Sequence, residues 1–261
     1  MNKTGILLVQ LGTPDAPTSS ALRRYLRQFL SDPRLIEIPR FLWWAILNLF
    51  ILPFRPRQSA EKYKRVWDAK TGSPLLHYTK RQTELLREKF PDHMVEFGMQ
   101  IGNPPLHTVL EEMVKKGIEK VIVLPMYPQF SATTTASAMD CLGMAMQKIR
   151  KVPAIHFIPP YYDHPAYISA LADIIHEQTA KLEWKPDHFL ISFHGIPISY
   201  CQRGDPYATH VKRTTFALVK KMGWERKQWS QTFQSLFGRE EWLKPYTEPY
   251  LEKLAEHGVK K

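Results

Sequence analysis

A histidine lies where an apolar run meets a turn. The run at residues 189–193 combines aliphatic and aromatic residues, which is typical of a buried strand. His194 follows it directly, and Gly195-Ile196-Pro197 then prevents a strand or a helix from continuing. Open α/β sheets bind their ligands at the carboxyl ends of strands, so the imidazole is placed to accept a proton or to bind a metal ion. The alternative is a core histidine that is bonded to a backbone carbonyl.

A second group of polar side chains follows the apolar run at residues 121–124. Residues 125–135 read Pro-Met-Tyr-Pro-Gln-Phe-Ser-Ala-Thr-Thr-Thr. We expect the Ser/Thr residues to cap the next helix, or to help its N-terminus hold a carboxylate or a phosphate. The loop at residues 12–18 allows the same two interpretations, and it lacks the G-x-G-x-x-G pattern of dinucleotide-binding proteins.

Strand-like and helix-like stretches alternate along the chain. Predicted strands lie at residues 6–11, 121–124, 155–158 and 189–193, and predicted helices at 19–30, 106–116, 135–150, 165–182 and 206–222. Such alternation predicts parallel βαβ units and therefore the α/β fold class with a doubly wound sheet.

Two internal similarities suggest that the chain has two related halves. ILLVQLGTP at residues 6–14 aligns with FLISFHGIP at 189–197, and LEEMVKKGIEK at 110–120 aligns with LEKLAEHGVKK at 251–261. We therefore expect Rossmann-like halves at residues 1–150 and 151–261, although all αβ units resemble one another to some degree. A strand follows residue 120 but nothing follows residue 261, so we expect the second half to be truncated and to lack a core strand.

Composition narrows the class of partner. Among 261 residues, 36 Lys and Arg stand against 25 Asp and Glu, which gives a formal charge of +11 and favours anionic partners. The basic residues are scattered and no nucleic-acid-binding motif accompanies them, so we expect no nucleic acid partner. The cysteines Cys141 and Cys201 form no CxxC pair, and this fits a reducing cytoplasm.

The longest apolar stretch covers residues 41–54. It contains Trp43 and Trp44 and is flanked by Arg40, Arg55 and Arg57. It is shorter than the roughly 20 residues that a membrane-spanning helix needs. We interpret it as a segment that lies on a membrane surface or forms an apolar lip over a pocket; the alternative is a fully buried helix.

Ten short blocks of residues, in order along the chain, match the sequence pattern of a known protein family. They are Leu8–Pro17, Arg24–Leu26, Phe29–Pro33, Gly72–Leu75, Gly102–Pro104, Leu124–Thr135, Ser192–Pro197, Arg203–Tyr207, Phe233–Ser235 and Trp242–Pro245. Over its whole length the chain resembles the ferrochelatases, the enzymes that insert Fe²⁺ into a porphyrin in the last step of haem synthesis. The resemblance implies two chelatase-type, Rossmann-like halves that clasp the macrocycle.

The resemblance also implies roles for single residues. His194 is expected to be the catalytic residue, either as acceptor of a pyrrole proton or as a metal ligand. Leu11, Tyr127 and Trp242 are expected to contact the porphyrin, and Ser131 and Thr133 complete the predicted substrate-binding set. Fe²⁺ is implied as a substrate, with no permanently bound cofactor. A cytoplasmic location is implied, with residues 41–54 as a lip on the inner face of the membrane.

Some positions depart from the pattern of the family. Gln100-Ile101 stand where members often have Arg-Tyr, Leu236 replaces a basic residue, and Gln10 replaces a common Asn. The family also pairs its histidine with a glutamate, in a region that would lie beyond Lys261. These differences leave open a non-catalytic porphyrin- or haem-binding protein, or a peripheral membrane protein, and the porphyrin can be protoporphyrin or coproporphyrin.

Overall fold

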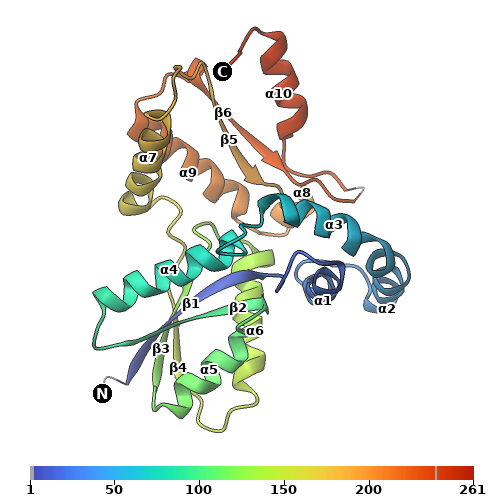
Figure 1. Cartoon of the computed structure of the whole chain (residues 1–261), viewed down its shortest axis with the longest axis vertical. Helices are drawn as coiled ribbons and strands as arrows, with labels where there is room; N and C mark the ends of the chain where they lie inside the picture. Colours follow the sequence, from blue (N-terminus) through green and yellow to red (C-terminus); the bar gives the residue numbers. More distant parts are fainter. Residues whose placement is uncertain (1–2, 239) are drawn as a thin grey trace. The chain divides into compact units, whose positions relative to one another are not determined.

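The computed structural model describes residues 3–238 and 240–261. The chain divides into two compact units (Figure 1). The first contains the described residues up to Tyr127 together with Ala132–Pro159, and the second contains Pro128–Ser131 together with Pro160–Lys261. The short segment Pro128–Ser131 therefore belongs with residues that lie far from it in the sequence. That the halves are related to each other stays a prediction.

A four-stranded parallel sheet forms the centre of the first unit. Its strands are β1 (Thr4–Thr13), β2 (Met94–Gly102), β3 (Lys120–Pro125) and β4 (Ala154–Phe157), in the order β2-β1-β3-β4. In β1, Gln10 pairs with Met99 and Gly12 pairs with Ile101. This register sets Leu11 level with Gln100, at the carboxyl end of the sheet.

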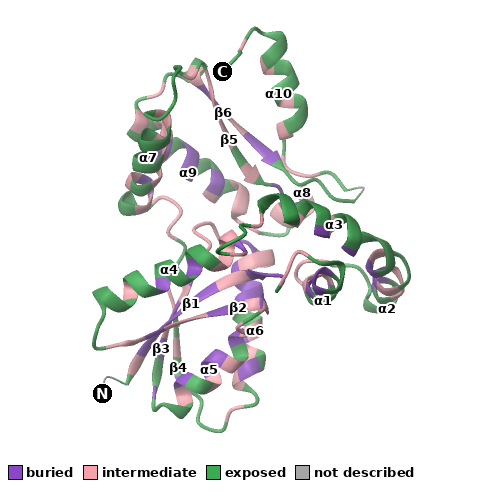
Figure 2. Cartoon of the chain, viewed as in Figure 1, coloured by how far each residue is buried: buried purple, intermediate pink, exposed green. Residues whose placement is uncertain are grey.

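Helices cover both faces of this sheet. Leu7 and Val9 of β1 pack against α5 (Leu106–Lys115) and α6 (Ser137–Met146), whereas Ile6 and Leu8 lie in the cluster that includes Leu86 of α4 (Pro74–Lys89). The buried residues run along β1 and the inner sides of these helices (Figure 2). Each fully buried leucine contributes about 1.5–3 kcal/mol to folding, so this apolar strand is the natural centre of the unit.

A helical layer beside the sheet carries the long apolar stretch. It consists of α1 (Ser19–Leu30), α2 (Arg40–Ala45), the π-helical η1 (Ile46–Ile51) and α3 (Leu52–Val66). Thr18 caps α1 by accepting a hydrogen bond from the backbone N–H of Ala21, at 3.4 Å. The Trp43 indole N–H donates to the carbonyl of Leu30 at 2.6 Å, which fastens α2 to the end of α1.

The second unit has a parallel pair of strands, β5 (Phe189–His194) and β6 (Trp229–Gln234). Its helices are α7 (Pro165–Thr179), α8 (Ile198–Gln202), α9 (Tyr207–Met222), η3 (Arg226–Gln228) and α10 (Thr247–Glu256). Side chains of α10 bind the polar side chains of β6: Tyr250 contacts Ser230 at 2.8 Å, and Thr247 contacts Thr232 at 2.9 Å.

The α/β class with parallel sheets is confirmed, and all four predicted strands are present. The expectation that the Ser/Thr cluster caps the next helix is wrong for α6. A π-helical turn, η2 (Ala132–Ala136), comes first, and the N-cap residue Ala136 makes no side-chain bond. A fully buried helix at residues 41–54 is also excluded, because Phe41 is 81% exposed. No helix of the described residues is long and apolar enough to cross a bilayer.

Candidate active site

His194 is the last residue of β5, as the sequence predicts. It is exposed, and it lies opposite Gln234 in the parallel pair of strands. Its Nδ1 is 2.7 Å from the carbonyl oxygen of Gly195. A carbonyl oxygen only accepts hydrogen bonds, so Nδ1 carries the hydrogen in the neutral ring and Nε2 keeps its lone pair. Nε2 is therefore the atom that can take up a proton or bind a metal ion.

Trp242 lies beside this histidine, and the structure brings these two predicted site residues together. Their ring centroids are 6.1 Å apart and the rings are tilted by 44°. Gly195 makes the close packing possible, since a Cβ at this position would lie 3.1 Å from Cε3 of Trp242. The indole Nε1 of Trp242 is buried and has no hydrogen-bond partner among the described residues.

A second ring supports the backbone of His194. The Tyr207 hydroxyl donates to the carbonyl oxygen of His194 at 2.9 Å. Burial raises the pKa of this hydroxyl, and the nearby Asp205 raises it further, so Tyr207 keeps its proton at neutral pH. Asp205 also accepts from the Ser131 hydroxyl at 2.9 Å. Ser131, a predicted substrate contact, is thus held within the second unit.

The segment Pro128–Ser131 is attached to α9 by two hydrogen bonds. The backbone N–H of Phe130 donates to Nδ1 of His210 at 3.1 Å, and the Gln129 amide donates to the Thr214 hydroxyl at 3.0 Å. The His210 ring stacks on Tyr162 with a centroid separation of 3.8 Å. Burial lowers the pKa of His210, as does Arg213, against the opposing effect of Asp205 and Asp163. Sequence reasoning missed this anchor because its members lie 80 residues apart.

The other predicted substrate contacts belong to the first unit. Leu11 packs partly against the cluster of Leu22, Tyr25, Ala60 and Ile101. The Tyr127 hydroxyl donates to the Gln100 side-chain oxygen at 2.6 Å, and Thr133 lies in η2. The roles of Leu11, Tyr127 and Thr133 as porphyrin contacts stay predictions.

No cluster that could hold a resident metal ion is found among the described residues. None of their His, Cys, Asp and Glu side chains form a group of three or more with such geometry. Burial raises the pKa of both cysteine thiols, Cys141 and Cys201. Neither side chain is therefore activated as a thiolate at neutral pH.

Comparison with known proteins identifies the class of protein to which the chain belongs. The family model described as Ferrochelatase matches residues 3–261, and this places the chain in the class of porphyrin metal chelatases, which are enzymes. The match covers both compact units, including β5 and its histidine. The chain belongs to the ferrochelatase family.

Curated relatives match over nearly the whole chain. A ferrochelatase of Mesorhizobium japonicum is 46% identical over 99% of this chain and 74% of its own length. A ferrochelatase of Marinobacter nauticus is 46% identical over 99% of this chain and 71% of its own length. A ferrochelatase of Pectobacterium atrosepticum is 45% identical over 99% of this chain and 80% of its own length.

Proposed function

We propose that this chain inserts Fe²⁺ into a free-base porphyrin to form haem, and that His194 carries the proton or metal chemistry. The observation behind the role of His194 is the hydrogen bond from its Nδ1 to the Gly195 carbonyl. That bond leaves Nε2 as the basic atom of an exposed ring at the carboxyl end of β5. Membership of the ferrochelatase family supplies the reaction.

The reaction needs a base. When a divalent metal enters a free-base porphyrin, the two pyrrole N–H groups each lose a proton. Nε2 of His194 accepts one of these protons and solvent water takes the other, while the imidazolium keeps its Nδ1 bond to the Gly195 carbonyl. In the alternative role, the same lone pair binds Fe²⁺ and passes it to the ring. A metal-dependent spectral change in the absence of porphyrin would support the ligand role alone.

The predicted binding residues divide by chemistry. Leu11, Tyr127 and Trp242 supply apolar or aromatic surface for a flat macrocycle. Ser131 and Thr133 supply hydroxyls for the polar edge of the substrate. The hydrogen bond from Ser131 to Asp205 weighs against direct donation to a propionate, because the Ser131 proton is already engaged. We therefore assign Ser131 a smaller role than Thr133 in binding the carboxylates of the porphyrin.

A Soret assay tests the proposed activity. Purified protein is mixed with Fe²⁺ under anaerobic conditions, or with Zn²⁺, and a free-base porphyrin. We expect the Soret band to move to that of the metalloporphyrin faster than in a protein-free control. A shift typical of bound but unmetallated porphyrin would instead identify a non-catalytic carrier. No spectral change beyond the control would contradict both functions.

We further propose that the protein holds no resident cofactor and that Fe²⁺ passes through it only as substrate. The proposal rests on membership of the ferrochelatase family, in which Fe²⁺ is the substrate. Protein treated with a chelator and dialysed should recover its full rate when the substrate metal alone is added. A requirement for a second metal or an organic factor would contradict the proposal.

We also propose a cytoplasmic protein that touches the inner face of the membrane through its apolar lip, residues 41–54. Phe41, Trp44, Phe50 and Phe54 are all more than half exposed, and Arg55 is exposed next to them. Aromatic side chains beside arginines suit the boundary between acyl chains and anionic headgroups. Such a contact would let a porphyrin, whose macrocycle is apolar, pass between the membrane and the protein.

A further inference from the structure

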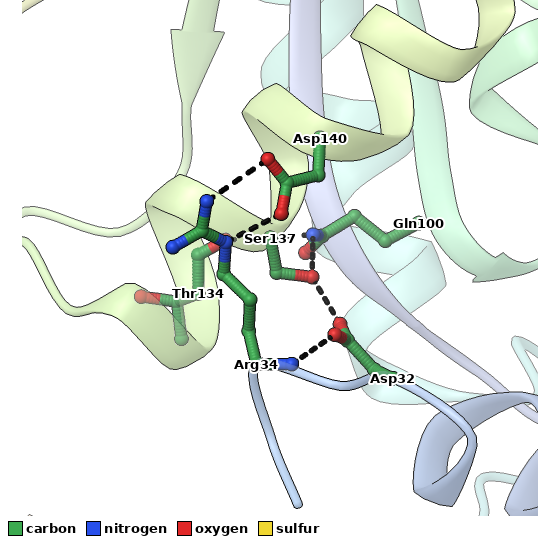
Figure 3. Close-up of polar contacts among 6 residues, drawn as sticks. All are labelled: Asp32, Arg34, Gln100, Thr134, Ser137 and Asp140. Carbon is green, nitrogen blue, oxygen red and sulfur yellow. Dashed lines mark hydrogen bonds and ion pairs between the residues drawn. The ribbon is translucent and has the colours of Figure 1, made fainter. Parts of the chain in front are cut away.

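A chain of polar side chains lies at the carboxyl end of the first sheet. Figure 3 shows six of its members, which come from the loop after α1, from β2, from η2 and from α6. They are Asp32, Arg34, Gln100, Thr134, Ser137 and Asp140. Tyr127 extends the chain, since its hydroxyl is 2.6 Å from Oε1 of Gln100. Gln100 lies near the end of β2 and Tyr127 follows β3, and these strands flank β1, so their bond spans the end of β1.

One end of this chain is anchored by charge. Arg34 donates its backbone N–H to Oδ1 of Asp32 at 2.8 Å. The guanidinium of Arg34 pairs with both carboxylate oxygens of Asp140, and Nη2 lies 3.0 Å from Oδ1. Hydrogen bonding to Asp140 raises the pKa of Arg34, which stays charged. A bidentate pair of this kind holds the loop in one geometry.

The anchor fixes the direction of every hydrogen bond that follows. The carboxylate of Asp32 only accepts, so the Ser137 hydroxyl donates to it. Ser137 therefore accepts from the Gln100 amide nitrogen, which is 3.1 Å away, and the same nitrogen faces the Thr134 carbonyl at 3.4 Å. This sets the orientation of the amide, and Oε1 is left to accept from Tyr127.

The order of donors and acceptors along this chain extends to the hydroxyl of Tyr127. Its proton points into the polar chain, so the oxygen presents lone pairs and not a hydrogen to any other partner. We propose that Gln100 is a positioning residue that fixes Tyr127 as a hydrogen-bond acceptor toward the bound porphyrin. Tyr127 then complements the N–H groups of the macrocycle and does not bind a propionate, which needs a donor. The proposal rests on the proposed function.

A double-mutant cycle tests it. Gln100→Met keeps the shape of the side chain but removes both polar groups, and Tyr127→Phe removes the hydroxyl. We expect Gln100→Met to raise the KM for porphyrin by up to about tenfold, the range of one hydrogen bond, with little change in kcat. In the Tyr127→Phe background the same substitution should have no further effect, because the group it positions is gone. A merely structural role would give additive effects and would overturn the proposal.

Two further variants check the result of the double-mutant cycle. Ser137→Ala removes the acceptor that orients the amide, and it should raise KM in wild type but not in Tyr127→Phe. Gln147→Leu, an exposed glutamine at the end of α6, is the matched control and should leave KM unchanged. If Gln100→Met does not fold, as judged by circular dichroism, the cycle of Ser137→Ala with Tyr127→Phe gives the same decision.

The outcomes separate this proposal from the proposed function. If wild type binds porphyrin but does not metallate it, the proposed activity fails, and the cycle is measured on the porphyrin Kd. Loss of the Gln100→Met effect in the Tyr127→Phe background then still supports the positioning role. Additive effects in an active protein overturn only the positioning role. A wild type that neither binds nor metallates porphyrin overturns both.

Discussion

Two histidines of the second unit have opposite tautomers, and one hydrogen bond decides each case. Nδ1 of His194 faces a carbonyl, so it carries the hydrogen and leaves Nε2 basic. Nδ1 of His210 faces the Phe130 backbone N–H, so it accepts, and the hydrogen of the neutral ring lies on Nε2. The first arrangement suits a base or a metal ligand, and the second suits a structural acceptor. Residue type alone does not distinguish them, and only the position of His194 at a strand end marked it in the sequence.

The structural histidine gives a prediction about pH. Protonation of His210 at Nδ1 would remove the acceptor for Phe130, and the pKa of His210 is lowered in the folded protein. The unfolded chain therefore takes up this proton first as pH falls. The contribution to stability is complete above about pH 6.5, the pKa of a free histidine, and is lost as pH falls from there toward the lower folded pKa. Urea unfolding between pH 8 and pH 5 measures this loss.

A conservative variant isolates that contribution. His210→Asn places an amide oxygen near the position of Nδ1 and does not titrate. The difference in unfolding free energy between wild type and His210→Asn should shrink or reverse as pH falls, and at high pH it should be within about 1 kcal/mol, the value of one hydrogen bond. Parallel pH profiles for the two proteins would show that His210 does not titrate on unfolding as described.

Strands were predictable where they are apolar. The runs of β1, β3, β4 and β5 are short apolar segments, and each was identified near its observed bounds. β6 was missed because its buried Ser230 and Thr232 are polar, and their burial depends on hydrogen bonds to α10. β2 was missed because Gly98 and Gln100 interrupt its apolar pattern. A Cβ at Gly98 would lie 2.7 Å from Cδ1 and 2.9 Å from Cα of Leu106 in α5, so this glycine allows the helix to approach.

The sequence alone did not show which side chains of the lip are buried and which are exposed. Trp43, Leu47 and Leu52 are buried on one side of the α2–η1–α3 segment, while Trp44 and Phe50 are both 65% exposed on the other. The π-helical turn between α2 and α3 changes the helical phase, so a simple period of 3.6 residues does not describe this pattern. The arginines at its ends stay at the surface.

Vesicle binding tests the lip. Replacing Trp44 and Phe50 with serine removes apolar surface that would enter the headgroup region, and we expect binding to anionic vesicles to fall by at least about tenfold. Co-sedimentation with phosphatidylglycerol-containing vesicles measures the partition. Tyr78→Ser is the matched control, because Tyr78 is also 65% exposed but lies on α4. Equal binding by wild type and the double variant would argue against membrane contact through this segment.

At the scale of the whole molecule, family membership was recognisable from short blocks spread along the chain. The blocks include strand ends and turns, where the local sequence determines the backbone, and they identified the class without any knowledge of contacts. The polar chain through Asp32, Gln100 and Ser137 was not predictable, because it joins residues that are 37 to 105 positions apart. The sequence showed Gln100 only as a departure from the family pattern.

The charge of the whole protein gives a prediction about salt. A formal charge of +11 attracts a dianionic porphyrin, and salt screens this attraction over distances of about 10 Å. We expect KM for porphyrin to rise several-fold between 0.05 and 0.5 M NaCl, while kcat changes little. A porphyrin with esterified propionates is the matched control and should show no such rise. A KM that does not respond to salt for the free acid would exclude long-range attraction as part of recognition.

We propose that the histidine at the carboxyl end of β5 carries the chemistry of metal insertion. His188 precedes β5 at its other end, where its ring bonds to Lys227 and Ser230, so it offers a control histidine in the same unit. The decisive measurement is the kcat of Zn²⁺ insertion by His194→Ala and by His188→Ala, each at saturating porphyrin. We predict a loss of at least about a hundredfold for His194→Ala, as expected when a catalytic base is removed, and a change of less than about threefold for His188→Ala. Equal rates for wild type and a folded His194→Ala variant would contradict it.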